Sequence, residues 1–126
     1  MQPTGMTALL NVEDMTASLR FYEALGFEVV ERLDCGKEVP SWCLLTLGDL
    51  RLMLNETSRA ASESRRARED FSDAVFYLYV DDAPAAWSEL QSRGVEGRHV
   101  GPQDHGLDEV WLRDPDGYHL VVASDV

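Results

Sequence analysis

The sequence predicts an α+β fold in which one small β-α-β-β-β unit is used twice in tandem. The first observation behind this prediction is a repeat at a fixed offset of 68 positions: Val12-Glu13-Asp14 and Gly26-Phe27 return as Val80-Asp81-Asp82 and Gly94-Val95. An offset that holds without gaps indicates one supersecondary unit present twice. The second observation is that the same order of strand and helix signals follows each copy. The chain has 126 residues, and we expect residues 1–126 to form a single domain.

The first half begins with a short, largely apolar strand over residues 7–12. Asp14 is then in position to cap a helix, and Gly26 to end it, because glycine commonly follows the last helical turn. The apolar face predicted for this helix repeats at helical spacing and consists of Met15, Leu19, Tyr22 and either Leu25 or Phe27.

Three strands are expected to complete the first copy. One spans residues 27–33, and two further apolar runs span residues 42–47 and 50–54. Gly48-Asp49 separates the last two and is a two-residue hairpin signal. The first copy therefore reads β-α-β-β-β.

A charged stretch over residues 56–70 separates the two copies. It holds four arginines, several acids and only alanine as apolar content, so we expect a solvated connector, with or without a fragment of helix. The predicted organisation is a first module of about residues 5–55, a connector of about 56–72 and a second module of about 73–126.

The second copy repeats the order of the first. A strand rich in aromatic and β-branched residues spans 74–80, and Asp82 caps a helix with Pro84 in its first turn and Gly94 at its end. The buried face predicted for the helix consists of Ala83, Ala86, Trp87 and Leu90.

The last three strands are predicted over residues 95–100, 109–113 and 118–123. The latter two are joined by Asp114-Pro115-Asp116-Gly117, which has the proline and glycine positions of a type I turn.

Composition narrows the classes of function. With 11 basic and 23 acidic side chains the formal net charge is −12, which disfavours nucleic acid as a partner. The acidic balance either attracts a cationic small molecule or only aids solubility. No apolar run is long enough to span a membrane and no basic leader precedes an apolar segment, so a cytoplasmic protein is expected. Cys35 and Cys43 are then expected to be free thiols.

Four segments in this order resemble the glyoxalase/bleomycin-resistance/dioxygenase superfamily, also called vicinal oxygen chelate proteins. The segments are Asn11-Val12-Glu13-Asp14, Phe21-Tyr22-Glu23-Ala24-Leu25-Gly26-Phe27, Tyr79-Val80-Asp81-Asp82 and Leu112-Arg113-Asp114-Pro115-Asp116-Gly117. The resemblance covers nearly the whole chain apart from the connector. It implies two βαβββ modules whose sheets form a cupped, open mixed β-barrel with the helices outside. It also implies a homodimer that binds ligands inside the cups.

Enzymes of this superfamily hold a divalent metal on the cup floor with histidines and glutamates, and the metal polarises substrate oxygens. Carried over one by one, those positions fall on Thr7, Leu52, Val75 and Val121. One threonine and three aliphatic side chains cannot replace imidazole and carboxylate ligands. His119 lies near Val121 on the same strand face, but one imidazole is not a metal site. The resemblance is therefore to a metal-free member, with no cofactor expected.

Metal-free members are most often bleomycin-resistance-type proteins, which bind a drug without altering it. The chain is similar to them in placing Glu109 two residues before Trp111, ahead of the Asp-Pro-Asp-Gly turn. It departs from them at His105, where resistance proteins usually carry an aromatic residue. This departure argues against a specific preference for bleomycin.

Strand alternation and the resemblance together select the candidate ligand-binding residues. Asn11 shares a strand face with Thr7, and Tyr77 and Tyr79 share one with Val75, so these side chains should point into the cup. There the two tyrosines either bind a ligand or fill a collapsed cup. The other ligand-binding candidates are Trp42, Trp111, His105 and His119, of which Trp111 has no face assigned by alternation and His105 lies on a loop.

The predicted function is metal-independent binding of a small molecule, cationic or aromatic, as in antibiotic sequestration. The alternative is a glyoxalase- or dioxygenase-like lyase or isomerase that uses an atypical metal site or acid–base chemistry of Glu109 and His105. Glu109 is the candidate general base, although a carboxylate without a positioned partner does not by itself indicate catalysis. A third possibility is that the surface and the connector contact another protein.

Overall fold

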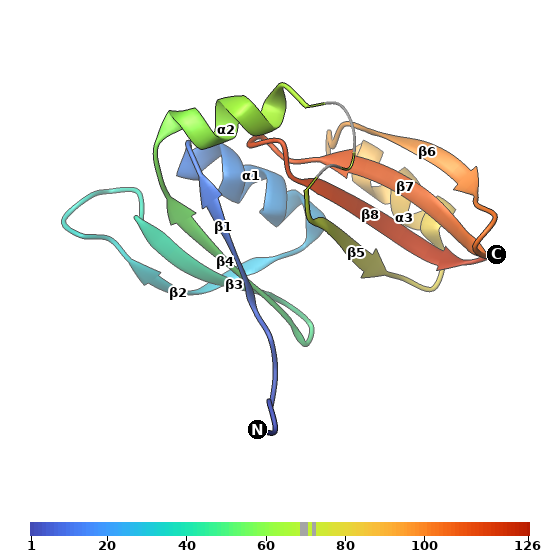
Figure 1. Cartoon of the computed structure of the whole chain (residues 1–126), viewed down its shortest axis with the longest axis horizontal. Coiled ribbons are helices and arrows are strands. Elements are labelled where there is room, and N and C mark those ends of the chain that lie inside the picture. The colour runs from blue at the N-terminus through green and yellow to red at the C-terminus, as the bar shows by residue number, and fades with distance from the viewer. Residues whose placement is uncertain (69–70, 72) are drawn as a thin grey trace. The chain divides into compact units, whose positions relative to one another are not determined.

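The computed structural model describes residues 1–68, 71 and 73–126 and divides into two compact units, Met1–Ser62 and Glu63–Val126. Each unit holds one βαβββ module with a four-stranded mixed sheet (Figure 1). The predicted fold class of two tandem βαβββ modules is therefore confirmed.

The first module consists of β1 (Ala8–Val12), α1 (Met15–Leu25), β2 (Glu28–Leu33), β3 (Trp42–Leu47) and β4 (Leu50–Glu56). Its strands are ordered β1-β4-β3-β2. The first and last strands of the module run parallel, and the other neighbours are antiparallel. α1 supplies part of the long connection that a parallel pair requires.

The second module consists of β5 (Val75–Tyr79), α3 (Ala83–Ser92), β6 (Gly97–Pro102), β7 (Leu107–Arg113) and β8 (His119–Asp125). Its strand order, β5-β8-β7-β6, is that of the first module, again with the first and last strands parallel. The repeat seen in the sequence is therefore a repeat of topology.

The capping signals read from the sequence act as predicted. The Asp14 carboxylate accepts a hydrogen bond from the Ala17 N–H at 3.2 Å, and Gly26 ends α1 with φ 109°. The Asp82 carboxylate accepts from the Ala85 N–H at 2.9 Å at the start of α3. In each copy a side-chain acceptor satisfies an N–H that has no partner inside the helix.

One predicted strand is displaced. The strand expected over residues 95–100 is Gly97–Pro102, because the Val95 N–H donates to the Leu90 carbonyl at 3.0 Å. Val95 is buried and closes the end of α3 instead of entering the sheet.

The core of each unit lies between one face of the sheet and the helix that covers it. α1 packs on β4, and α3 packs on β7 and β8. The first core is built from Leu10, Val12, Met15, Tyr22, Cys43, Leu45 and Leu54, and the second from Ala83, Leu90, Val110, Leu112, Leu120 and Val122, all of them buried. The opposite face of each sheet is not covered by its helix.

The arginine-rich stretch contains a short helix. Residues Arg59–Arg66 form α2, so the helical part of the predicted connector spans eight residues. Ser62 is buried, and the other described side chains of α2 are exposed or partly exposed. The Arg65 guanidinium lies over the Tyr118 ring, 3.8 Å from its centroid. Residues 69, 70 and 72 of the predicted connector lie outside the described residues.

None of the helices in the described part of the chain combines the length and the apolar character that crossing a membrane requires.

Candidate functional site

The candidate site lies on the open face of the second sheet, which we define as the face opposite α3. Cross-strand pairing fixes the members of this face: Trp111 is opposite both Val121 and Arg98, and Tyr77 is also opposite Val121. Alternation along each strand extends the set, which includes Val75, Tyr77, Tyr79, Arg98, Glu109, Trp111, Arg113, His119, Val121 and Ala123.

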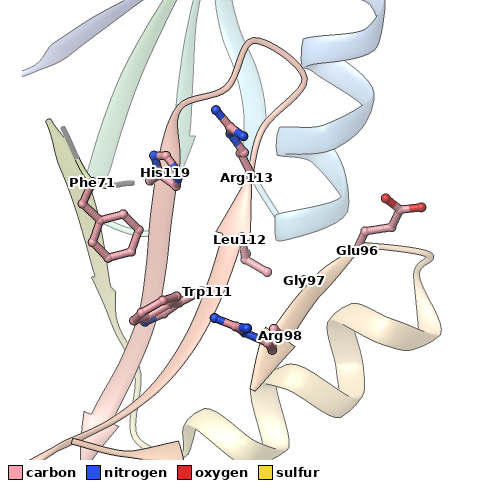
Figure 2. Close-up of a pocket in the computed structure, with 8 residues that line it drawn as sticks. All are labelled: Phe71, Glu96, Gly97, Arg98, Trp111, Leu112, Arg113 and His119. Atoms are coloured by element: carbon pink, nitrogen blue, oxygen red, sulfur yellow. The ribbon is translucent and has the colours of Figure 1, made fainter. Parts of the chain in front are cut away.

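Three aromatic side chains on and beside this face form what we call the aromatic wall, consisting of Phe71, Trp111 and His119 (Figure 2). The Phe71 ring centroid is 4.8 Å from that of Trp111 and 4.9 Å from that of His119. The wall borders a cavity of about 540 Å³, a size typical of small-molecule sites. The cavity is lined by Phe71, Glu96, Gly97, Arg98, Trp111, Leu112, Arg113 and His119.

The two arginines of the cavity differ in their surroundings. The Arg113 guanidinium turns away from Trp111 and donates to the carbonyls of Arg65, Arg68 and Gly117 (Figure 2). The Arg98 guanidinium lies 5.3 Å from the centroid of the Trp111 ring, an arrangement typical of a cation–π contact. Within the described part of the chain, no hydrogen bond or ion pair engages the Arg98 side chain.

Glu109 is a buried carboxylate on the same face, with its side chain only 2% exposed. Its Oε1 accepts a hydrogen bond from Trp111 Nε1 at 2.9 Å, and its Oε2 accepts from the Tyr77 hydroxyl at 3.1 Å. His105 Nε2 also lies 3.1 Å from Oε2. A buried charge is tolerated only where donors compensate its lost hydration, and here three side chains surround it.

This cluster determines the orientation of the Trp111 ring and the ionisation of the Tyr77 hydroxyl. The hydrogen bond to Nε1 fixes the plane of the Trp111 indole beside the cavity. Partial burial, together with the hydrogen bond to Glu109 and its negative charge, raises the pKa of the Tyr77 hydroxyl. Tyr77 therefore stays a neutral donor to the carboxylate at physiological pH.

Several predicted site residues meet on the open face. Tyr77 and Trp111 both donate hydrogen bonds to Glu109, and His105 Nε2 lies beside the same carboxylate. Alternation had left the face of Trp111 undecided. Tyr79 lies beside Tyr77 with ring centroids 6.1 Å apart and is 72% exposed. His119 instead belongs to the aromatic wall.

Two other candidates lie in the first unit. Trp42 is half-buried in β3, opposite Asn55 of β4. Asn11 accepts a hydrogen bond from the Asn55 amide at 3.2 Å. Both lie on the sheet face opposite α1, as strand alternation predicts, and neither lines the 540 Å³ cavity.

Comparison with known families agrees with this architecture. The family model described as Glyoxalase/Bleomycin resistance protein/Dioxygenase superfamily matches residues 6–122. The chain belongs to this superfamily. No curated protein sequence matches the chain.

Solved structures of the glyoxalase/bleomycin resistance superfamily have the same fold. A bleomycin-binding protein complexed with bleomycin is 25% identical, with a TM-score of 0.71 over 98% of this chain and 100% of the other. A bleomycin resistance determinant encoded on the transposon Tn5 is 24% identical, with a TM-score of 0.72 over 98% of each chain. A lactoylglutathione lyase from Agrobacterium tumefaciens is 21% identical, with a TM-score of 0.69, 98% of this chain and 96% of the other being covered.

The residues at the superfamily's metal positions do not fit a divalent metal in this chain. Val75 and Val121 occupy the open face of the second sheet, and neither side chain has a donor atom. The matching of Leu52 to the cup floor was wrong: Leu52 pairs with Ala8 and is buried on the α1 side, so Met53 holds the open-face position. The described residues contain no group of three or more His, Cys, Asp or Glu side chains that could hold a metal ion.

Sequence reasoning missed Phe71 and Arg98. Phe71 is the one aromatic residue of the predicted connector, and this isolation was the signal that could have drawn attention to it. Arg98 lies in the displaced strand β6, and its place beside Trp111 depends on the β6–β7 register, which includes an irregularity between His99 and Gly101. Such a register is not readable from one sequence.

Proposed function

We propose that this protein binds a small molecule with a planar aromatic group without requiring a metal. The observation that carries the proposal is the aromatic wall of Phe71, Trp111 and His119 on a cavity of about 540 Å³. Glu109 holds the Trp111 ring in one orientation before a ligand arrives. A stacking surface that is already ordered loses little conformational entropy on binding, which favours affinity.

The test is a Trp111→Leu variant titrated with 2-naphthamide by calorimetry, in protein treated with a chelator. We expect wild-type protein to bind the probe and the variant to bind it about tenfold more weakly, since leucine cannot stack. A Trp42→Leu variant measures separately whether the first unit takes part. Equal binding by wild type and Trp111→Leu, or binding that needs added Ni²⁺, Zn²⁺, Fe²⁺ or Mn²⁺, would contradict the proposal.

A more specific proposal is that the small molecule is an antibiotic, which the protein sequesters. A structural neighbour that is 25% identical along its whole length binds bleomycin, which supports drug binding as a role for this fold. We expect the melting temperature of the protein to rise with some member of a panel of glycopeptide-type and intercalating antibiotics. If no compound in the panel changes the melting temperature, antibiotic sequestration is contradicted. The binding of other aromatic compounds is tested separately, by the naphthamide titration.

A second candidate function is acid–base catalysis, and the contact of His105 with Glu109 favours it. His105 Nε2 lies 3.1 Å from the carboxylate, and the His105 side chain is 54% exposed. A carboxylate that orients an imidazole is the arrangement of many general bases. Incubating bound aromatic compounds with wild type and His105→Gln and measuring product by mass spectrometry decides between catalysis and binding.

We also propose that the protein is a homodimer. Large apolar side chains remain exposed on the uncovered sheet faces, among them Leu9 at 44%, Leu33 at 59% and Tyr79 at 72%. Exposed apolar surface of this kind is typical of interfaces. Light scattering coupled to gel filtration should give twice the chain mass of 14.1 kDa, and a single-chain mass would refute the dimer.

A further inference from the structure

We propose that the cavity beside the aromatic wall selects planar aromatic compounds that carry an anionic group, such as a carboxylate. This inference rests on the proposed function, because it assigns the charge of a ligand that stacks on Trp111. The net charge of the chain suggested a cationic ligand, whereas the charges of the cavity itself point to the opposite sign.

Arg98 carries the inference. Its guanidinium lies 5.3 Å from the centroid of Trp111, so a ring stacked in the cavity has the cation within reach of a substituent. No described residue forms a hydrogen bond or an ion pair with it, and its donors are therefore available. A guanidinium presents paired N–H groups that match the two oxygens of a carboxylate.

The other charged groups around the cavity do not cancel this preference. Glu96 lines the cavity, but its carboxylate points away from Trp111 (Figure 2). Arg113 is engaged by three carbonyls. Glu109 accepts a hydrogen bond from the indole, but its side chain is only 2% exposed and also accepts a hydrogen bond from Tyr77. Among the described residues, the exposed charge next to the stacking surface is thus the positive one.

The net charge of −12 acts over a longer distance than this contact. At physiological ionic strength charges beyond about 8 Å are largely screened, so a ligand in the cavity responds mainly to its immediate neighbours. The acidic surface lowers the rate at which an anion arrives more than it lowers the stability of the bound contact.

Three planar compounds of matched size test the sign of the charge: 2-naphthoate, 2-naphthamide and 2-naphthamidine, which are anionic, neutral and cationic at pH 7. Dissociation constants are measured by calorimetry for wild type, Arg98→Gln and Trp111→Leu. Arg51→Gln is the matched control, because Arg51 is an exposed strand arginine of the first unit. Circular dichroism confirms that each variant is folded.

We expect wild type to bind 2-naphthoate about fivefold more tightly than 2-naphthamide, and 2-naphthamidine most weakly. Arg98→Gln should remove the difference between the three probes, Arg51→Gln should preserve it, and Trp111→Leu should weaken all three. If the probes bind equally well, if the cation binds best, or if Arg98→Gln keeps the order, the anionic preference is overturned while aromatic binding stands. If no probe binds wild type, the proposed function fails together with the inference.

Discussion

At the scale of single residues, Glu109 connects the fold to the site. Its carboxylate accepts hydrogen bonds from the Trp111 indole and the Tyr77 hydroxyl and lies beside the His105 imidazole, so removing its charge affects three side chains that come from two strands and a loop. Because the carboxylate is buried, its donors cannot be replaced fully by water. Glu109 is therefore a positioning residue for the stacking surface.

The variant Glu109→Gln tests this role through the ionisation of Tyr77. Partial burial and the adjacent carboxylate raise the pKa of Tyr77 in the wild type. Without the negative charge, the phenol should lose its proton at a lower pH, although burial keeps part of the effect. The measurement is a spectrophotometric titration of phenolate, with Tyr77→Phe identifying the contribution of Tyr77 among the four tyrosines. An unchanged Tyr77 titration in Glu109→Gln would contradict this account.

Cys43 gives a second prediction at the residue scale. Burial raises the pKa of the Cys43 thiol to about 11, and its Sγ lies 3.8 Å from the Met15 sulfur. Because the unfolded chain releases this proton at lower pH than the folded chain, the stabilisation is complete below about pH 9 and is lost as pH rises toward about 11. The loss should be at most about 3 kcal/mol in the free energy of unfolding.

Denaturant unfolding as a function of pH measures this contribution. Cys43→Ala should flatten the alkaline decline relative to wild type, whereas Cys35→Ala should not, since Cys35 is exposed. A thiol reagent should accordingly label Cys35 in the folded protein and Cys43 only after unfolding. An identical alkaline decline in wild type and Cys43→Ala would show that burial of the thiol does not matter.

At the scale of elements, hydrogen bonds join the C-terminal end of α2 to the turn Asp114-Pro115-Asp116-Gly117 of the second unit. The guanidinium groups of Arg65 and Arg66 donate to the carbonyls of Asp116 and Pro115, each at 3.3 Å. The composition of this stretch predicted that its arginines face solvent, but two of them bind backbone carbonyls of a turn. The same end of α2 receives Arg113 from β7, so the helix is held from two elements.

Gly117 makes this approach possible, which leads to a prediction. It has φ 88°, and a Cβ there would lie 2.9 Å from the Arg66 backbone nitrogen. Gly117→Ala should lower the free energy of unfolding by about 1 kcal/mol for the backbone conformation and by a further 1–3 kcal/mol, approximately, for the displaced helix.

Gly94→Ala is the matched control, because Gly94 has φ 80° but a methyl group added there would have no neighbour within 4 Å. Urea denaturation of both variants separates the two effects. Equal destabilisation would mean that the close contact with α2 contributes nothing.

At the scale of the whole molecule, the excess of 23 acidic over 11 basic side chains is the dominant long-range property. Like charges repel more in the compact state than in the expanded one. We expect the melting temperature to rise when salt increases from about 0.01 M to about 0.15 M, which shortens the screening length from about 30 to about 8 Å.

The control for this prediction compares sodium chloride with tetramethylammonium chloride at equal ionic strength. The same rise with both salts indicates screening, and a rise with only one indicates specific ion binding. A melting temperature that falls with salt would show that attractive ion pairs outweigh the repulsion.

Much of the fold could be predicted because its signals are local. The cap at Asp14, the left-handed Gly26 and the hairpin at Gly48 each act through neighbours within a few residues. The strand prediction failed at Val95, because its N–H binds the Leu90 carbonyl at the end of α3 instead of entering the sheet. Local signals also did not show that the arginines of α2 meet a turn about 50 residues away.

The candidate site was predictable only in part. Alternation placed Tyr77 and Tyr79 on the open face, since period 2 is a property of the strand itself. Alternation puts Glu109 and Trp111 on one face of β7, because they lie two residues apart, but it did not say which face. It also did not bring Arg98 beside the indole, because that contact depends on register between strands. A shift of one residue in register would move each of them to the other face.

The sequence by itself determined the repeated module, its helix ends, its acidic charge and the loss of donor atoms at Val75 and Val121. These features follow from residue type and short-range spacing. Only the tertiary structure decided which side chains form the site: the buried Glu109 with its donors Tyr77 and Trp111, the aromatic wall and the Arg98 guanidinium beside it. The physical reason is that a binding surface is assembled across strands, and cross-strand register is set by packing of the whole sheet rather than by any one segment.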